Sequence, residues 1–208
     1  MDYPYLTCQE FEECVKRFVA RYSSALEDGG THVSLQTSRT RRQYLTLQRA
    51  VYAKRAVSTP VHSEEDIEDD DPTNPVFEHT SDGTRIEYHI VYSATWRVPV
   101  LYVRVVTNSG EVVLDSERVC DLVTEDAEIR RAMAAVPFGG ALGVTDHPEL
   151  GVPFLYLHPC HTADLLRAVA APSAQGAGLK VGPDEYLAVW MSLSGAAVGL
   201  TLPSIGYC

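Results

Sequence analysis

The feature that most limits the fold of this chain is a run of β-branched and aromatic residues between Arg85 and Val106. Valine, isoleucine, tyrosine and tryptophan are enriched in strands because their side chains pack well on a pleated surface. The turn signal Asn108-Ser109-Gly110 follows the run. The run therefore predicts two or three strands, and with them a β-sheet against which the rest of the chain must pack.

Helices are expected both before and after this run in the sequence. Thr7 and Glu10 match a capping box, and apolar residues from Phe11 to Leu26 recur at helical spacing until Gly29-Gly30 ends the pattern. The remaining expected elements are a strand over Tyr44 to Tyr52, a short helix after Asp115, and helices over Glu125 to Val136, from Thr162 as N-cap with Asp164 in its first turn, and over Asp184 to Leu193.

The chain is acidic, but most of the excess charge lies in one segment. The net charge is −11, and the ten residues from Ser63 to Pro72 hold seven acids, without which −4 would remain. Such a segment has almost nothing to bury, so we expect a mobile acidic loop at about 58–80 within a single domain over 1–208. Without a basic face, the chain is not expected to bind nucleic acid or anionic membranes.

The cysteines indicate a reducing compartment. They lie at positions 8, 14, 120, 160 and 208, odd in number and scattered, with no signal peptide before them. No run approaches the roughly 20 apolar residues of a membrane span, so we expect a soluble, cytoplasmic protein. Cys8 and Cys14 lack the spacing of zinc ligands, and no metal site is expected.

One cysteine stands at a special place in the sequence. The apolar run Val152 to Leu157 is followed by His158-Pro159-Cys160, and a helix start comes directly afterwards. Pro159 favours an extended backbone at His158 and stops the strand, which predicts Cys160 on a fixed turn near the positive end of a helix dipole. Such a thiol suits a nucleophile, with His158 and His161 on either side of it. The alternative is a cysteine that serves only as a small apolar core residue.

At this motif the sequence resembles a known family. The segment Asp146 to Thr162, with its His-Pro-Cys hallmark, resembles the active-site segment of the E2-like conjugating enzymes of autophagy. Tyr92 to Arg104 and Tyr186 to Pro203 resemble the same family in the same order. The resemblance implies an α+β, ubiquitin-conjugating-like fold: an antiparallel sheet flanked by helices, with the N-terminal helix on one face and Cys160 between the last strand and the next helix.

The resemblance also implies a reaction and its partners. Cys160 would receive the C-terminal glycine of ubiquitin-like autophagy-related protein twelve as a thioester from E1-like autophagy-related protein seven, and would pass it to a lysine of autophagy-related protein five. His158 would serve the oxyanion or steady the loop. The acceptor would dock on the sheet region, where Tyr88 or Tyr92 reaches the site and Trp96 is an anchor. No metal or organic cofactor is required.

Several alternatives stay open at this point. The related branch of the family, autophagy-related protein three, joins a ubiquitin-like protein to a lipid amine. A cysteine hydrolase would need a distant histidine, for which His32, His62, His79, His89 and His147 are candidates by count alone. A non-catalytic adaptor would keep Cys160 as inert packing. Pro99 cannot donate a ladder hydrogen bond, so we also expect an open sheet edge there for pairing with another protein.

Overall fold

The computed structural model describes residues 1–52, 83–123, 142–172 and 179–203. The predicted acidic loop at 58–80, the predicted helix over 125–136 and Cys208 lie outside these ranges. Within them, no helix is long and apolar enough to cross a membrane.

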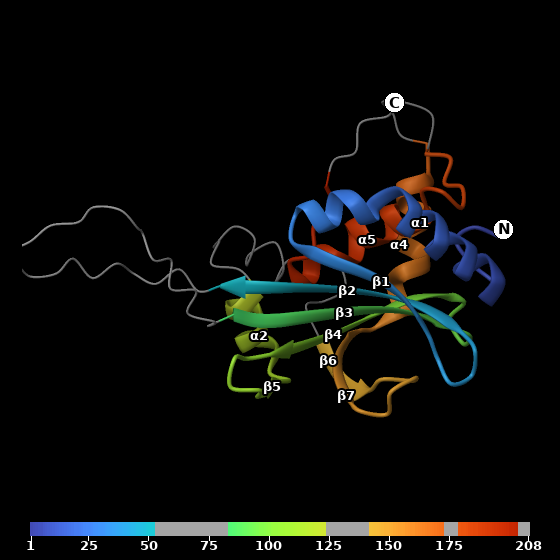
Figure 1. The fold of residues 1–208 in the computed structure, drawn as a ribbon. Coiled ribbons are helices and arrows are strands. Elements are labelled where there is room, and N and C mark those ends of the chain that lie inside the picture. The colour runs from blue at the N-terminus through green and yellow to red at the C-terminus, as the bar shows by residue number, and fades with distance from the viewer. Residues whose placement is uncertain (53–82, 124–141, 173–178, 204–208) are drawn as a thin grey trace, which may run out of the picture.

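In the described part of the chain, seven strands form one antiparallel sheet (Figure 1). Its order is β1-β2-β3-β4-β7-β6, with β5 paired to β4. The expected α+β class with an antiparallel sheet is therefore confirmed, and two strands account for the run over 85–106. The strands are β1 (Thr31–Thr37), β2 (Gln43–Tyr52), β3 (Gly83–Ser93), β4 (Val98–Val106), β5 (Val112–Val113), β6 (Leu142–Asp146) and β7 (Pro153–Leu157).

Helices cover one face of this sheet. Figure 1 shows α1, α4 and α5 together on that side. The expected capping box forms at the start of α1, where the Thr7 hydroxyl accepts the Glu10 N–H and the Glu10 carboxylate accepts the Thr7 N–H. The helices are α1 (Cys8–Asp28), α2 (Ser116–Val123), α4 (Thr162–Ala170) and α5 (Tyr186–Ser194), with single 3-10 turns η1 (Pro159–His161) and η2 (Gly195–Val198).

The core lies between the helices and the sheet. Because strand side chains alternate between faces, Tyr88 of β3 and Leu155 of β7 point toward the helices and are 0% exposed. They belong to one cluster with Phe11 of α1 and Trp190 of α5. The closing helix over Asp184 to Leu193 is thus confirmed as a buried element, although it begins at Tyr186. The side chains that face the helices are therefore core residues, whereas partly exposed side chains such as Tyr102 and Tyr156 lie on the opposite face of the sheet.

Two sequence predictions need correction here. Thr162 is not an N-cap: its backbone is already helical, at φ −57° and ψ −47°, because the turn η1 precedes α4 and places His161 at the cap. Pro99 does not mark an outer strand, since β4 lies between β3 and β7. The β4–β7 ladder joins only Tyr102 and Val103 to β7, so Pro99 lies beyond the end of β7 and its missing N–H is tolerated.

Candidate functional site

Cys160 lies on a short turn with buried neighbours. Strand β7 ends at Leu157, the turn η1 spans Pro159–His161, and α4 begins at Thr162. Leu157, Pro159 and Thr162 are buried, whereas the Cys160 side chain is exposed. His158 has the extended backbone that Pro159 predicts, at φ −64° and ψ 129°. The fold therefore holds a solvent-accessible thiol on a firmly anchored bend.

The His158 ring is tied to this bend. Its Nδ1 accepts the backbone N–H of Cys160 at 3.2 Å. Because a backbone N–H only donates, Nδ1 carries no proton and the proton of the neutral ring sits on Nε2. The imidazole thus caps the 3-10 turn with one nitrogen and presents a hydrogen-bond donor with the other.

Trp96 lies against the same histidine. The two ring centroids are 5.4 Å apart with an interplanar angle of 78°, an edge-to-face contact. Trp96 sits in the turn between β3 and β4, where its backbone N–H donates to the Ser93 hydroxyl. The residue is 43% exposed. His158 therefore contacts both the Cys160 turn and Trp96, which lies 64 positions before Cys160 in the sequence.

The two tyrosines expected near the site use their hydroxyls in other contacts. Tyr88 is 0% exposed, and its hydroxyl donates to the Val198 carbonyl and accepts from Arg49 Nε. The structure thus places Tyr88 in the core and not on a partner-binding surface, because its position in β3 points it toward the helices. Tyr92 is half-buried, and its hydroxyl donates to the Leu6 carbonyl at 2.7 Å.

The N-terminal segment braces the site, which the sequence did not reveal. The Tyr5 ring contacts two guanidinium groups, of Arg97 at 5.4 Å and of Arg167 at 5.1 Å. Arg97 follows Trp96 in its turn and has a left-handed backbone at φ 56°, while Arg167 lies on α4 just after Cys160. Tyr5 therefore links the two segments that carry the site residues. Its sequence signal is weak because a single surface tyrosine has no distinctive pattern.

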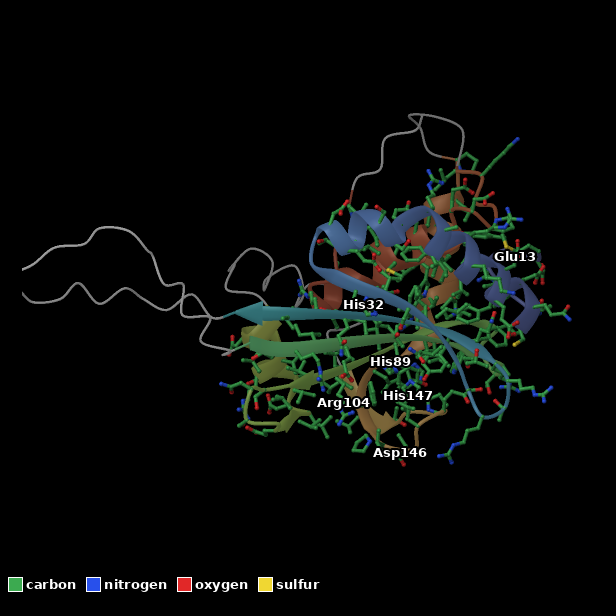
Figure 2. All side chains as sticks on the ribbon, viewed as in Figure 1. Glu13, His32, His89, Arg104, Asp146 and His147 are labelled. Carbon is green, nitrogen blue, oxygen red and sulfur yellow. The ribbon has the colours of Figure 1, made fainter. Side chains whose placement is uncertain are left out.

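Two other histidines form a separate buried pair (Figure 2). Nδ1 of His89 lies 3.1 Å from Nε2 of His147, and the side chains are 8% and 1% exposed. His147 Nδ1 accepts the Glu149 N–H, so its Nε2 carries the proton and donates to His89. Desolvation, and for His89 also the nearby His147 and Arg104, lowers the pKa of His89 to about 3; desolvation lowers that of His147 to about 4.

This pair bears on the hydrolase alternative. A hydrolase needs a histidine that is free to take a proton from the cysteine. His89 and His147 are buried and bonded to each other. His32 is exposed and lies 3.8 Å from the Glu27 carboxylate at the end of α1. Two histidines lie at the Cys160 turn itself: His161 is its exposed last residue, and His158 caps it through Nδ1, which is therefore already occupied.

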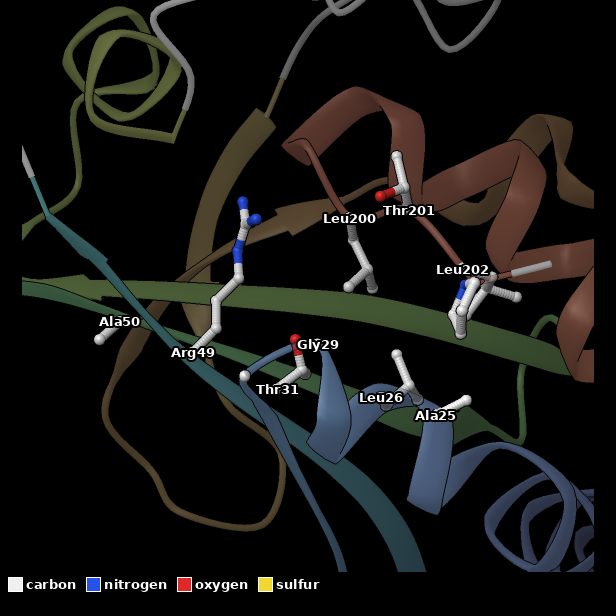
Figure 3. Close-up of a pocket in the computed structure, with 11 residues that line it drawn as sticks. Ala25, Leu26, Gly29, Thr31, Arg49, Ala50, Leu200, Thr201 and Leu202 are labelled. Carbon is white, nitrogen blue, oxygen red and sulfur yellow. The ribbon is translucent and has the colours of Figure 1, made fainter. Parts of the chain in front are cut away.

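A cavity of about 490 Å³ opens on the helix side of the sheet, away from these residues. Figure 3 shows Arg49 of β2, Leu26 of α1 and Leu200 facing it. None of its lining residues belongs to the Cys160 turn. Among the described residues, no cluster of three or more His, Cys, Asp or Glu side chains is arranged to hold a metal ion.

Fold and site together define a class of protein: an antiparallel α+β domain with an exposed cysteine at the turn after a buried strand. The family model described as "Autophagocytosis associated protein, active-site domain" matches residues 10–205. The chain belongs to this family.

Named relatives agree with this assignment. The chain is 33% identical over 124 residues to "Ubiquitin-like-conjugating enzyme ATG10" of Homo sapiens, covering 59% of this chain and 52% of that protein. It is 31% identical over 118 residues to the Arabidopsis thaliana protein of the same name, covering 56% and 50%. The match spans about half the length of these relatives. A solved structure titled "Crystal structure of Autophagic E2, Atg10" aligns with TM-score 0.44 and 13% identity over 90% of this chain and 94% of that one.

Proposed function

We propose that this chain is an E2-like enzyme of autophagy that carries ubiquitin-like autophagy-related protein twelve as a thioester on Cys160. The carrier is charged by E1-like autophagy-related protein seven, and a lysine of autophagy-related protein five receives the protein. The observation that carries the proposal is the exposed thiol on an anchored turn within the family's active-site domain. The reaction suits the cytoplasm, where thiols stay reduced.

The reaction consists of two acyl transfers at one sulfur. The Cys160 thiolate attacks the carbonyl carbon of the E1-bound thioester, a tetrahedral oxyanion forms, and the E1 thiolate leaves. The neutral lysine amine then attacks the new thioester, the Cys160 thiolate leaves, and an isopeptide bond remains after the amine has lost its proton. Neither transfer changes an oxidation state, so no redox partner enters.

The His158 ring can assist both transfers as a hydrogen-bond donor. Since its Nδ1 accepts the Cys160 N–H, the Nε2–H is the group that is left to point toward the reacting carbonyl. A neutral donor of this kind stabilises the oxyanion, whereas a general base would need a free ring lone pair. We therefore assign His158 to oxyanion stabilisation, and the acceptor amine must lose its proton to another group.

A thioester assay tests the proposal. The chain is mixed with the E1-like enzyme, ATP and the ubiquitin-like protein, and the adduct is resolved with and without reductant. We expect a reductant-sensitive adduct from the natural chain and from Cys8→Ser, whose half-buried thiol is a matched control. Cys160→Ser should give a reductant-resistant ester or no adduct.

Discharge of the loaded enzyme separates the two branches of the family. Transfer to a lysine of autophagy-related protein five supports the proposal, whereas transfer to vesicles that carry a lipid amine indicates the lipid-conjugating branch. An adduct that Cys160→Ser leaves reductant-sensitive would contradict the assignment of Cys160.

A further inference from the structure

Four aromatic rings form a continuous stripe that includes His158, the ring that caps the Cys160 turn. Tyr102 of β4 stacks on Tyr156 of β7 at 6.2 Å, Tyr156 contacts His158 at 5.9 Å, and His158 contacts Trp96 at 5.4 Å. Tyr102 and Tyr156 alternate with buried core residues along their strands, so they lie on the sheet face opposite the helices. All four rings are partly or fully exposed. We call this surface the aromatic stripe.

The stripe is fixed in place before any partner arrives. Tyr156 lies opposite Gly143 of β6, and a methyl group at position 143 would come within 2.7 Å of the Tyr156 ring. Glycine at this position therefore lets the ring lie flat over β6. Such a ring needs little further ordering when a ligand binds it.

The chemistry of the stripe is uncharged and donor-rich. It contains no carboxylate, ammonium or guanidinium group. The hydroxyls of Tyr102 and Tyr156 make no hydrogen bond within the described ranges, and both are accessible. Desolvation, together with the neighbouring Tyr156, raises the pKa of Tyr102, so this hydroxyl stays protonated and able to donate. A ligand with carbonyl oxygens and little side-chain charge fits this surface.

We infer that the aromatic stripe binds the extended, glycine-terminated tail of the ubiquitin-like protein and leads it to Cys160. The inference rests on the proposed function, because the tail must end at the Cys160 sulfur. Three ring-to-ring steps of 5.4, 5.9 and 6.2 Å span at most about five extended residues, at roughly 3.4 Å per residue. Peptide carbonyls would accept from the tyrosine hydroxyls, and glycine lets the backbone approach the rings closely.

An acceptor lysine fits the same surface less well. Its ammonium group is attracted to one aromatic face at a time, within about 6 Å of the ring. Four rings in a row offer a longer binding surface than a single lysine uses. An extended peptide tail is therefore the occupant that the length of the stripe favours.

Charging kinetics test this inference. Transfer of the ubiquitin-like protein from the E1-like enzyme to Cys160 is measured in single turnover at subsaturating donor. Tyr156→Ala should slow charging about tenfold, the loss of roughly one aromatic contact. Tyr156→Phe should slow it less, and Gly143→Ala should slow it by displacing the ring. Tyr22→Ala, which removes a half-buried tyrosine from α1, should charge at the natural rate.

A direct binding measurement covers variants that fold poorly. A synthetic peptide with the last ten residues of the ubiquitin-like protein is titrated into the natural, isotope-labelled chain. Backbone shifts at Tyr102, Tyr156 and Trp96 support the inference, and shifts confined to another surface overturn it. If Tyr156→Ala charges normally and only transfer to the acceptor protein slows, the stripe belongs to the acceptor. If the natural chain forms no thioester at all, the proposed function fails first.

Discussion

His158 shows how much a single side chain contributes at this site. Pro159 forces its extended backbone, the Cys160 N–H fixes its tautomer, and Trp96 packs on its ring. Sequence analysis predicted the backbone from the proline rule, but not the tautomer, because that depends on a bond that only the 3-10 turn creates. The same turn explains why Thr162 is not the N-cap. Because η1 precedes α4, the backbone is already helical at Thr162, and His161 takes the cap position.

Removal of the His158 ring should affect both the turn and the reaction. His158→Ala should lower the single-turnover rate of thioester discharge by about 100-fold, the scale of one lost oxyanion donor. His158→Asn should retain the rate within about tenfold, because its side-chain oxygen can accept the Cys160 N–H while its amide still donates. Equal losses in both variants would contradict the donor role. Melting temperatures serve as the check on folding.

At the scale of elements, the strands that sequence analysis missed are the two-residue β5 and the two strands at the edges of the sheet. Strand β1 reads Thr-His-Val-Ser-Leu-Gln-Thr, and only part of it is buried. Strand β6 carries Gly143 and an exposed Val144. Edge strands bury little, so their composition is close to that of a loop, whereas the central strands β3 and β4 leave only Arg85 fully exposed and are obvious in the sequence.

The junction after η2 offers a stability test at the same scale. Gly199 has φ +64°, and a methyl group there would collide with the Val123 side chain of α2. Gly199→Ala should therefore destabilise the fold by about 2–4 kcal/mol, from left-handed strain plus overpacking. Gly110→Ala is the matched control, since Gly110 has φ +83° with open space around it, and should cost only about 1–2 kcal/mol. Urea denaturation measures both, and equal costs would contradict the collision.

For the whole molecule, the buried pair His89 and His147 sets a sensitivity to acid. Both folded pKa values are lowered, to about 3 and about 4, below the unfolded value of about 6.5. The unfolded chain therefore binds protons first as pH falls. Stability should be complete above pH 6.5 and should decline as pH falls toward 4, by roughly 1–2 kcal/mol per histidine at pH 5.

A variant isolates this effect. His147→Gln keeps hydrogen-bonding capacity but does not titrate, so its unfolding free energy should fall less steeply between pH 6.5 and pH 4 than that of the natural chain. Urea denaturation at a series of pH values gives the slopes. Parallel curves for the two chains would show that the buried pair does not control the acid response.

The positions of the two tryptophans give this molecule a built-in optical probe. Trp190 is sealed in the core at 1% exposure, whereas Trp96 stands at the surface against His158. A change in indole emission when a partner is added to the intact, folded chain would therefore originate at Trp96. Occupation of the Cys160 region can be followed in real time by its natural fluorescence, without a dye attached to the protein.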